Sequence, residues 1–190
     1  AGKGNDTITT KSGTDTIIFN SGDGADTLVD VDSLDTIKFN DVQFNQLTFT
    51  RNQNDLEITN STDTNDKLII QGFFTNTTNA INAIITSDSE AAHSIINEAI
   101  INVDLSTHST ETAPYSATNY NEVFSNTGYV ENLNNEKDIL TFNDETTYTQ
   151  TSNTTLKITD NTNTITIVDY TTNNIPKVAV NQILDTIEDK

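Results

Sequence analysis

Short runs in which apolar and polar residues alternate follow one another along the chain, separated by turns rich in Asn and Asp. In the first half they occupy residues 35–39, 47–51, 54–59 and 67–70. Alternation with a period of two over such lengths is typical of strands that bury one face. We therefore expect residues 41–86 to form successive strands of a small, largely antiparallel sheet.

A weaker copy of this pattern returns in the second half of the chain. Three segments there resemble three segments of the first half: 138–143 and 35–40, 155–159 and 55–59, and 164–170 and 67–74. The correspondence predicts two related β-rich units. The second, over residues 121–190, is expected to lack a glycine-rich segment before its strands.

Between the two sets of strands the apolar positions follow a different period. Ser87–Glu90 has the Ser-x-x-Glu form of a helix N-terminal capping box. The apolar residues after it recur at helical spacing: Ala92, Ile95, Ile96, Ala99, Ile100 and Val103. This spacing predicts a helix of about four turns over Asp88–Val103. The stretch 106–120 is rich in Ser and Thr and contains Pro114, so residues 87–120 are expected to form a helix and a linker.

The first forty residues carry a repeat that the rest of the chain lacks. Five of the seven glycines lie within the first 24 residues. The triplet Asp-Thr-Ile, or its Leu variant, recurs at steps of nine, eleven and nine and begins at Asp6, Asp15, Asp26 and Asp35. Residues 1–9 match the pattern G-G-x-G-x-D-x-U-x, where U is apolar, at every position but the first.

The residue types in this pattern point to a calcium site. Glycine adopts the positive φ that a tight turn requires, which lets backbone carbonyls converge, and a carboxylate then completes a set of oxygen ligands suited to Ca²⁺. A single Gly-x-Gly-x-Asp segment would be interpreted as an ordinary turn between short strands. Four phased copies favour the calcium interpretation.

In these repeats the chain resembles the RTX family, whose calcium-binding nonapeptide repeats occur in proteins exported by bacterial type I secretion. The resemblance implies a short parallel β-roll, residues 1–40, in which consecutive turns lie on alternate sides and one ion is shared between a turn and the next but one. That arrangement pairs Asp6 with Asp26 and Asp15 with Asp35, twenty residues apart in each case. The fourth copy has serine where glycine is expected, which predicts a weaker or absent second site.

The strands after the repeats resemble the segment that commonly follows RTX repeats, which implies that they cap the open end of the roll, with Phe73 and Phe74 as a plug. The expected fold class is all-β dominated: a short parallel β-roll capped by antiparallel strands, then a helix and a second β-rich unit. The expected Ca²⁺ ligands all belong to the repeats: Asp6, Asp15, Asp23, Asp26, Asp35, Gly2, Gly4, Gly13, Gly22 and Gly24.

Composition supports a cation as the partner. The chain has 28 Asp and Glu against 9 Lys and Arg, a net charge of -19, which disfavours nucleic acid and anionic membranes. The absence of cysteine excludes disulfides, thiolate zinc sites and a cysteine nucleophile. No apolar run approaches the roughly eighteen residues of a membrane span, and no signal-peptide core is expected at the N-terminus.

Motifs of catalytic sites are missing from the sequence. His93 and His108 lie outside any His-Glu-x-x-His frame and are expected on the surface. The sequence has no nucleophile elbow, phosphate-binding loop or dinucleotide fingerprint. Acidic residues are numerous enough for a glycosidase carboxylate pair, but no pair stands out. We therefore expect that the chain is not an enzyme.

These features predict a calcium-binding C-terminal module of a secreted bacterial RTX protein, located outside the cell or at its surface. Its expected partners are calcium ions and the type I secretion machinery, with calcium driving folding after export. A secretion signal is expected within residues 175–190, where Ile183, Leu184 and Ile187 give a helical amphipathic pattern. The alternative is a calcium-dependent surface-structural module, an S-layer or adhesin subunit that associates with itself or with a cell-surface ligand. Toxin, lipase or protease chemistry upstream in a parent protein is compatible with both.

Overall fold

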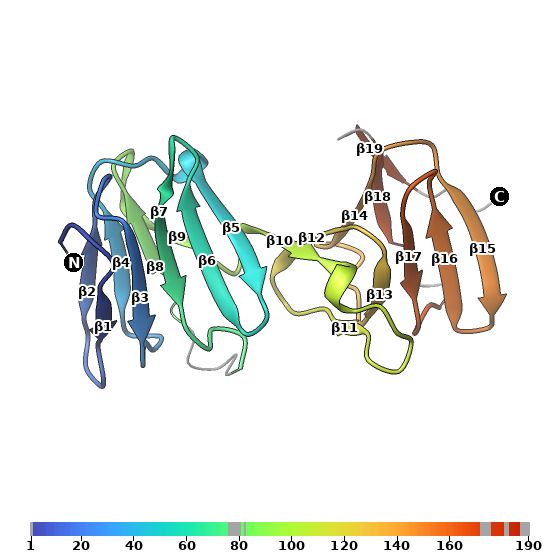
Figure 1. Ribbon diagram of the computed structural model, residues 1–190, viewed down its shortest axis with the longest axis horizontal. Coiled ribbons are helices and arrows are strands. Elements are labelled where there is room, and N and C mark those ends of the chain that lie inside the picture. The colour runs from blue at the N-terminus through green and yellow to red at the C-terminus, as the bar shows by residue number, and fades with distance from the viewer. Residues whose placement is uncertain (1, 76–80, 82, 172–175, 181–182, 187–190) are drawn as a thin grey trace. The chain divides into compact units, whose positions relative to one another are not determined.

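The computed structural model describes residues 2–75, 81, 83–171, 176–180 and 183–186. Within them the chain is all β, as Figure 1 shows, with strands joined by turns and by two short 3-10 helices, Phe44–Gln46 and Leu105–Thr107. No α-helix occurs in these residues, and none of their helical segments is long and apolar enough to cross a membrane. The chain divides into two compact units, Ala1–Ile101 and Asn102–Lys190.

Consecutive strands of the first unit alternate between two parallel sheets. The strands concerned are β1 (Thr7–Thr9), β2 (Thr16–Phe19), β3 (Ala25–Val29), β4 (Thr36–Phe39), β7 (Asp63–Ile70) and β8 (Ala83–Thr86). β1, β3 and β7 pair in parallel in one sheet, and β2, β4 and β8 do so in the other. Thr7 lies opposite Thr27 and Thr16 opposite Thr36, so the two pairs of repeat strands share a separation of twenty residues.

The apolar positions of these strands form the core of the first unit. Leu28 and Leu68 from one sheet, and Ile37 and Ile84 from the other, have no exposed surface. Burying a side chain of this size contributes roughly 1.5–3 kcal/mol. The residues between them face outward, which explains why each strand keeps the alternation seen in the sequence.

The strands expected between residues 41 and 86 are present. β5 (Leu47–Asn52), β6 (Asp55–Asn60) and β7 pair in antiparallel fashion, and β8 forms a hairpin with β9 (Ser89–Ser94). Phe73 is buried and Phe74 half-buried, with their rings edge to face. The Arg51 guanidinium lies 4.2 Å from the centre of the Phe74 ring.

The second unit repeats the strand order of the first. Its strands are β11 (Tyr115–Ser116), β12 (Asn121–Ser125), β13 (Gly128–Glu131), β14 (Ile139–Phe142), β15 (Thr147–Ser152), β16 (Thr155–Thr159), β17 (Thr164–Ile167), β18 (Lys177–Val180) and β19 (Ile183–Thr186). β11, β13 and β17 are parallel, as are β12, β14 and β18. β15, β16 and β17 form the antiparallel part. The sequence pattern predicted β14, β16 and β17, but not the parallel strands β11–β13.

The helix expected over Asp88–Val103 is wrong. These residues form the turn after β8, then β9, a second turn and most of β10 (Ile100–Asp104). Ile100 is 55 % exposed, whereas four alternating neighbours are buried: Ala99, Ile101, Val103 and Leu105. The true period is therefore two, and the β-branched Ile and Val side chains fit a strand better than a helix.

The end of the chain also differs from the expectation. Ile183–Thr186 forms strand β19, which pairs with β18, instead of an amphipathic helix. Ile187, the last residue of the expected helical pattern, lies outside the described residues. The expected linker, residues 106–120, contains the strand β11.

Candidate calcium site

The glycines of the repeat lie in turns that require them. φ is 126° at Gly4, 148° at Gly13, 84° at Gly22 and 99° at Gly24, a region that side chains strongly disfavour. A Cβ atom at Gly24 would lie only 2.3 Å from the carbonyl oxygen of Gly4. The turns before β1 and β3 therefore meet backbone to backbone, and the Gly4 amide donates to the carbonyl oxygen of Asp23 at 2.8 Å.

Asp26 is the second residue of β3, directly after one of these turns, and it is fully buried. Its Oδ1 atom accepts a hydrogen bond from the Asp6 amide at 2.9 Å. Its Oδ2 atom is also buried but has no hydrogen-bond donor. Burial raises the pKa of the Asp26 carboxyl, and the charges of Asp6 and Asp23 raise it further. A buried carboxylate oxygen without a hydrogen-bond donor costs free energy, so a cation or a proton bound at this atom would be stabilising.

Asp35 has the corresponding place in the other sheet, but its surroundings differ. Its Oδ1 atom accepts from the Asp15 amide at 3.0 Å, and its Oδ2 atom accepts from the Asp32 amide at 3.0 Å. Asp35 is only 1 % exposed, yet both of its oxygens have donors. The Asp35 carboxylate therefore has less need of a cation than the Asp26 carboxylate.

The remaining predicted ligands lie nearer the surface, with one exception. Asp6, Gly2 and Gly13 are exposed and Asp15 is half-buried. The Gly2 amide lies 3.3 Å from Asp6 Oδ2. Asp23 is the exception, since it is 7 % exposed.

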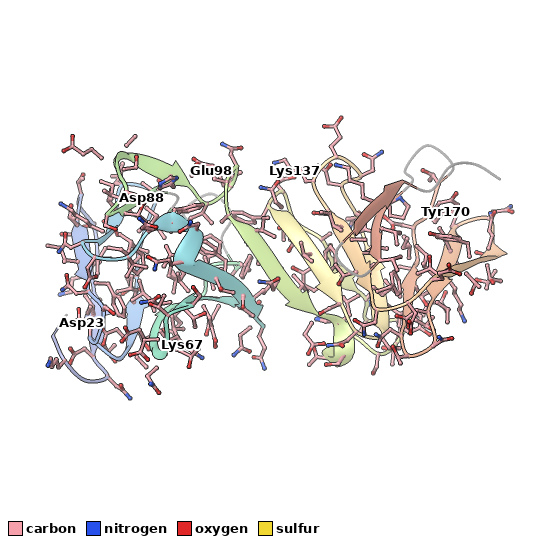
Figure 2. All side chains as sticks on the ribbon, turned by 90° about the horizontal axis from the view of Figure 1, so that it is seen from above. Asp23, Lys67, Asp88, Glu98, Lys137 and Tyr170 are labelled. Atoms are coloured by element: carbon pink, nitrogen blue, oxygen red, sulfur yellow. The ribbon has the colours of Figure 1, made fainter. Side chains whose placement is uncertain are left out.

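Asp23 and Asp66 order the turn before β3. Asp23 Oδ2 accepts from the Asn20 amide at 2.9 Å, and Figure 2 shows Asp23 among the first strands. Asp66, 2 % exposed, accepts from the Gly22 amide at 2.8 Å and from the Gly24 amide at 3.2 Å. Sequence reasoning missed Asp66. Its signal was an acidic residue shortly before the apolar run of β7, the strand next to β3.

In the part of the chain that the structure describes, no three side chains of His, Asp or Glu are grouped so that they could hold a metal ion by themselves. A Ca²⁺ ion at Asp26 would therefore depend on backbone carbonyls of the glycine turns as well as on carboxylate oxygen. Ca²⁺ accepts such mixed oxygen ligands in flexible geometry. The orphaned Asp26 Oδ2 and the chemistry of these donors fit such an ion.

In the second unit Asp138 is the counterpart of Asp35, and its two oxygens have the same kind of donors. Asp138 comes directly before β14, as Asp35 comes directly before β4. Its Oδ1 atom accepts from the Glu122 amide at 3.2 Å and its Oδ2 atom from the Asn134 amide at 2.8 Å. Burial, followed by the charge of Glu122, raises the pKa of the Asp138 carboxyl to about 7.

Glu122 itself is fully buried in the second unit. Its carboxylate accepts from the Thr118 amide at 2.6 Å and from the Tyr115 hydroxyl. Burial raises the pKa of the nearby Tyr120 hydroxyl to about 12, and the Glu122 charge adds to this effect. The carboxylate oxygens of Glu122 and Asp138 therefore have protein donors, whereas the Asp26 Oδ2 atom has none.

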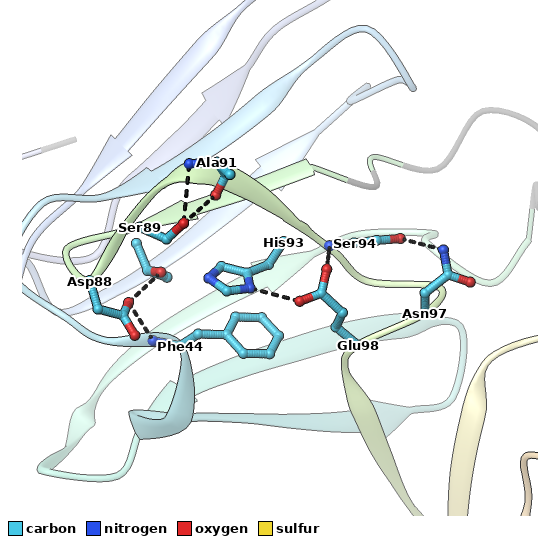
Figure 3. Close-up of polar contacts among 9 residues, drawn as sticks. Phe44, Asp88, Ser89, Ala91, His93, Ser94, Asn97 and Glu98 are labelled. Carbon is cyan, nitrogen blue, oxygen red and sulfur yellow. Dashed lines mark hydrogen bonds and ion pairs between the residues drawn. The ribbon is translucent and has the colours of Figure 1, made fainter.

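A second polar cluster joins the β8–β9 hairpin to the first 3-10 helix (Figure 3). His93 Nδ1 lies 2.9 Å from Glu98 Oε2, and the His93 ring stacks on Phe44 with ring centres 4.1 Å apart. Asp88 Oδ1 accepts from the Phe44 amide at 3.2 Å and from the Thr86 hydroxyl at 2.7 Å. The side chain of His93 is 19 % exposed. His93 is therefore packed against Phe44 and is not the fully exposed surface residue that the sequence predicted.

Together the fold and the site define an all-β protein of two units, in which strands alternate between parallel sheets and the first unit carries glycine turns around a buried aspartate. No family model and no curated protein matches the chain. Among solved structures, the chain is similar to an extracellular lipase from Serratia marcescens, at 8 % sequence identity and a TM-score of 0.29. The match covers 92 % of this chain and 39 % of that chain. A likeness at this level carries no argument about activity.

Proposed function

We propose that the first unit is a calcium-binding roll of the RTX type, and that the chain is a calcium-binding C-terminal module of a secreted bacterial protein. In this proposal the chain leaves the cell through type I secretion machinery and folds when it meets calcium outside. The observation that carries the proposal is the buried Asp26 Oδ2 atom, which has no protein donor and lies beside the glycine turns. Strand partners twenty residues apart support the roll.

The expected coupling of calcium to folding follows from the charge on Asp26. Without a cation, desolvation and the neighbouring Asp6 and Asp23 disfavour the ionised carboxylate, which opposes folding at neutral pH. Bound Ca²⁺ would favour that ionised form through its charge. Binding to the folded state alone would contribute about 2.7 kcal/mol at a calcium concentration a hundred times the Kd. The first unit would therefore be looser in low calcium and ordered in the calcium-rich exterior.

The test compares thermal unfolding and circular dichroism of the full chain in calcium and in chelator, for wild type and for Asp26→Asn. Calcium is expected to raise the Tm of wild type, and the variant is expected to lose most of that rise. Asp35→Asn is the matched control, because both oxygens of Asp35 already have donors. It is expected to lower the Tm in both conditions and to keep the calcium-dependent rise.

An unchanged spectrum and Tm after chelation would refute calcium-coupled folding. Equal loss of the calcium effect in both variants would refute the assignment to Asp26. The export half of the proposal has a separate test, in which residues 175–190 are fused to a reporter and secretion by a type I exporter is measured. A reporter that stays in the cell would count against a signal in that segment.

A second candidate function is a calcium-dependent surface-structural module, as in an S-layer or adhesin subunit. The observation that favours it is the second unit, which repeats the strand order of the first without the glycine turns. Coupling calcium to folding needs the first unit alone, so the second would serve another purpose. Light scattering of the full chain tests this candidate. Larger particles in millimolar calcium than in chelator would support it, and the same size in both would contradict it.

A further inference from the structure

Strand β15 is an open and fully exposed edge in the second unit. It is last in the strand order β11-β13-β17-β16-β15, and within the described residues its sheet neighbour is β16 alone. All six residues of Thr147–Ser152 are exposed. The register shift in this hairpin lies between Gln150 and Ser152, next to the turn, so Thr147–Gln150 keep regular pairing with β16. The outer backbone groups of β15 are thus available to another strand.

This edge lacks the protection that natural edge strands usually carry. Charged side chains, proline or very short length normally prevent pairing with other chains. β15 has the sequence Thr-Tyr-Thr-Gln-Thr-Ser, with no charge and no proline. By contrast, β9, which ends the strand order of the four-stranded sheet, carries Glu90 and His93, and β1 has only three residues.

The uncharged sequence of β15 indicates which partner fits this edge. Two copies with a net charge of -19 repel each other, so a contact between them must avoid acidic residues. β15 provides a six-residue strand without any, rich in residues that favour β structure. A two-fold contact places the same strand from each copy side by side, which makes an uncharged edge complementary to itself.

The neighbours of β15 also set the direction of pairing. Asp144 and Glu145 precede the strand, and Lys157 on β16 lies opposite Thr149 near its middle. Parallel pairing would bring the two acidic pairs of two copies together. Antiparallel pairing places them at opposite ends and leaves the strand centres in contact. We propose that β15 is an association edge that pairs in antiparallel fashion with β15 of a second copy of this chain.

Charge substitutions at Thr149 test this proposal on the full chain. Wild type is expected to show a monomer–dimer equilibrium in sedimentation velocity, in calcium and in chelator alike, because the edge belongs to the unit without glycine turns. Thr149→Lys and Thr149→Glu each place like charges near the two-fold axis. Thr149→Lys is expected to raise the dimer Kd by about tenfold or more, and Thr149→Glu to raise it less, because Lys157 lies opposite residue 149 in the same copy and offsets the Glu charge. A mixture of the two variants is expected to restore the dimer as a heterodimer.

Thr48→Lys is the matched control, since Thr48 is an exposed threonine in β5 of the first unit. It is expected to leave the dimer Kd within about twofold of wild type. Circular dichroism of each variant separates loss of association from loss of folding. A monomeric wild type at all concentrations, an equal effect of Thr48→Lys, or a Lys–Glu mixture that stays monomeric would each overturn the proposal. These outcomes do not depend on whether Asp26 binds calcium.

Discussion

Replacing Asp138 by Asn is expected to remove most of the pH dependence of the second unit's stability between about pH 4 and pH 8. The Asp138 carboxyl is 2 % exposed, and burial next to Glu122 raises its pKa from 3.8 to about 7. A folded-state pKa above the unfolded value means that the folded unit binds this proton more tightly. The stability from this group is therefore fully present below about pH 4 and is lost as the pH rises through about 7.

The size of the effect follows from the pKa values. A change from 3.8 to about 7 is a factor of roughly a thousand in proton affinity, or ~4 kcal/mol of unfolding free energy. The Asn side chain has no proton to lose, so this pH dependence disappears. It also presents one NH₂ group where Asp138 accepts from two amides, which is expected to cost about 1–3 kcal/mol. The variant should thus be the less stable protein at pH 5, and the deficit should vanish or reverse above pH 7.

Tyrosine fluorescence during urea unfolding is the measurement, because it reports on the second unit alone. The chain has no tryptophan, and all five tyrosines belong to that unit: Tyr115, Tyr120, Tyr129, Tyr148 and Tyr170. Chelator in every sample removes any contribution from calcium. Asp160 does not interfere. Its burial opposes ionisation, but the amides of Asn163, Thr162 and Asn143 lower its pKa to about 2, so its contribution is lost only at lower pH.

The reasoning would be refuted if the free energies of wild type and Asp138→Asn differed by the same amount from pH 5 to pH 8. A constant difference would mean that the carboxyl titrates equally in both states, as an exposed group does. Carbon-13 NMR of the Asp138 carboxyl provides a direct check. It is expected to titrate near pH 7, and a midpoint near 4 would contradict the burial argument.

Two further predictions concern the packing of the first unit. Gly24→Ala places a Cβ 2.3 Å from the Gly4 carbonyl oxygen at a φ of 99°, so it is expected to lower the free energy of urea unfolding by more than about 1–3 kcal/mol. Gly2→Ala, where a Cβ would have no atom within 4 Å, is expected to leave that free energy unchanged. Equal effects of the two substitutions would contradict the close approach of the turns. Leu28→Ala removes a side chain without exposed surface and is expected to lower the unfolding free energy by about 2–5 kcal/mol. Ile100→Ala, at a residue 55 % exposed, is expected to lower it by under about 1 kcal/mol, and the same urea series measures both.

Period-two alternation in the sequence predicted many of the strands, because the buried face of each strand is set by local side chains. The resemblance to RTX repeats implied that residues twenty apart meet, and the structure brings Asp26 to the amide of Asp6 and Asp35 to the amide of Asp15. The helix was predicted wrongly because Ile and Ala are dense after residue 90, so the same residues fit a helical period and a strand period. The pairing of β9 with β8, and the burial of Ile101 beside an exposed Ile100, show that the strand period is the true one.

The buried acidic residues could not be predicted from the sequence. Glu122, Asp66 and Asp138 are at most 2 % exposed, although acidic residues in a chain of this composition usually face solvent. Asp66 and Asp138 accept from amides of distant parts of the chain, and Glu122 accepts from the nearby Thr118 amide, and these contacts exist only after folding. The parallel strands β11–β13 were missed for a related reason. Gly128 is the single glycine of the second unit, so its turns lack the residue type that marked the turns of the first.

Because the two units share a strand order, they show the same framework with glycine turns and without them. Asp35 and Asp138 accept from two backbone amides in their respective units, and the glycine turns around Asp26 are what the first unit has in addition. The glycine turns are thus an addition to a shared scaffold. Grafting turns between the units would give engineered modules in which sensitivity to an ion is added or removed without redesigning the core.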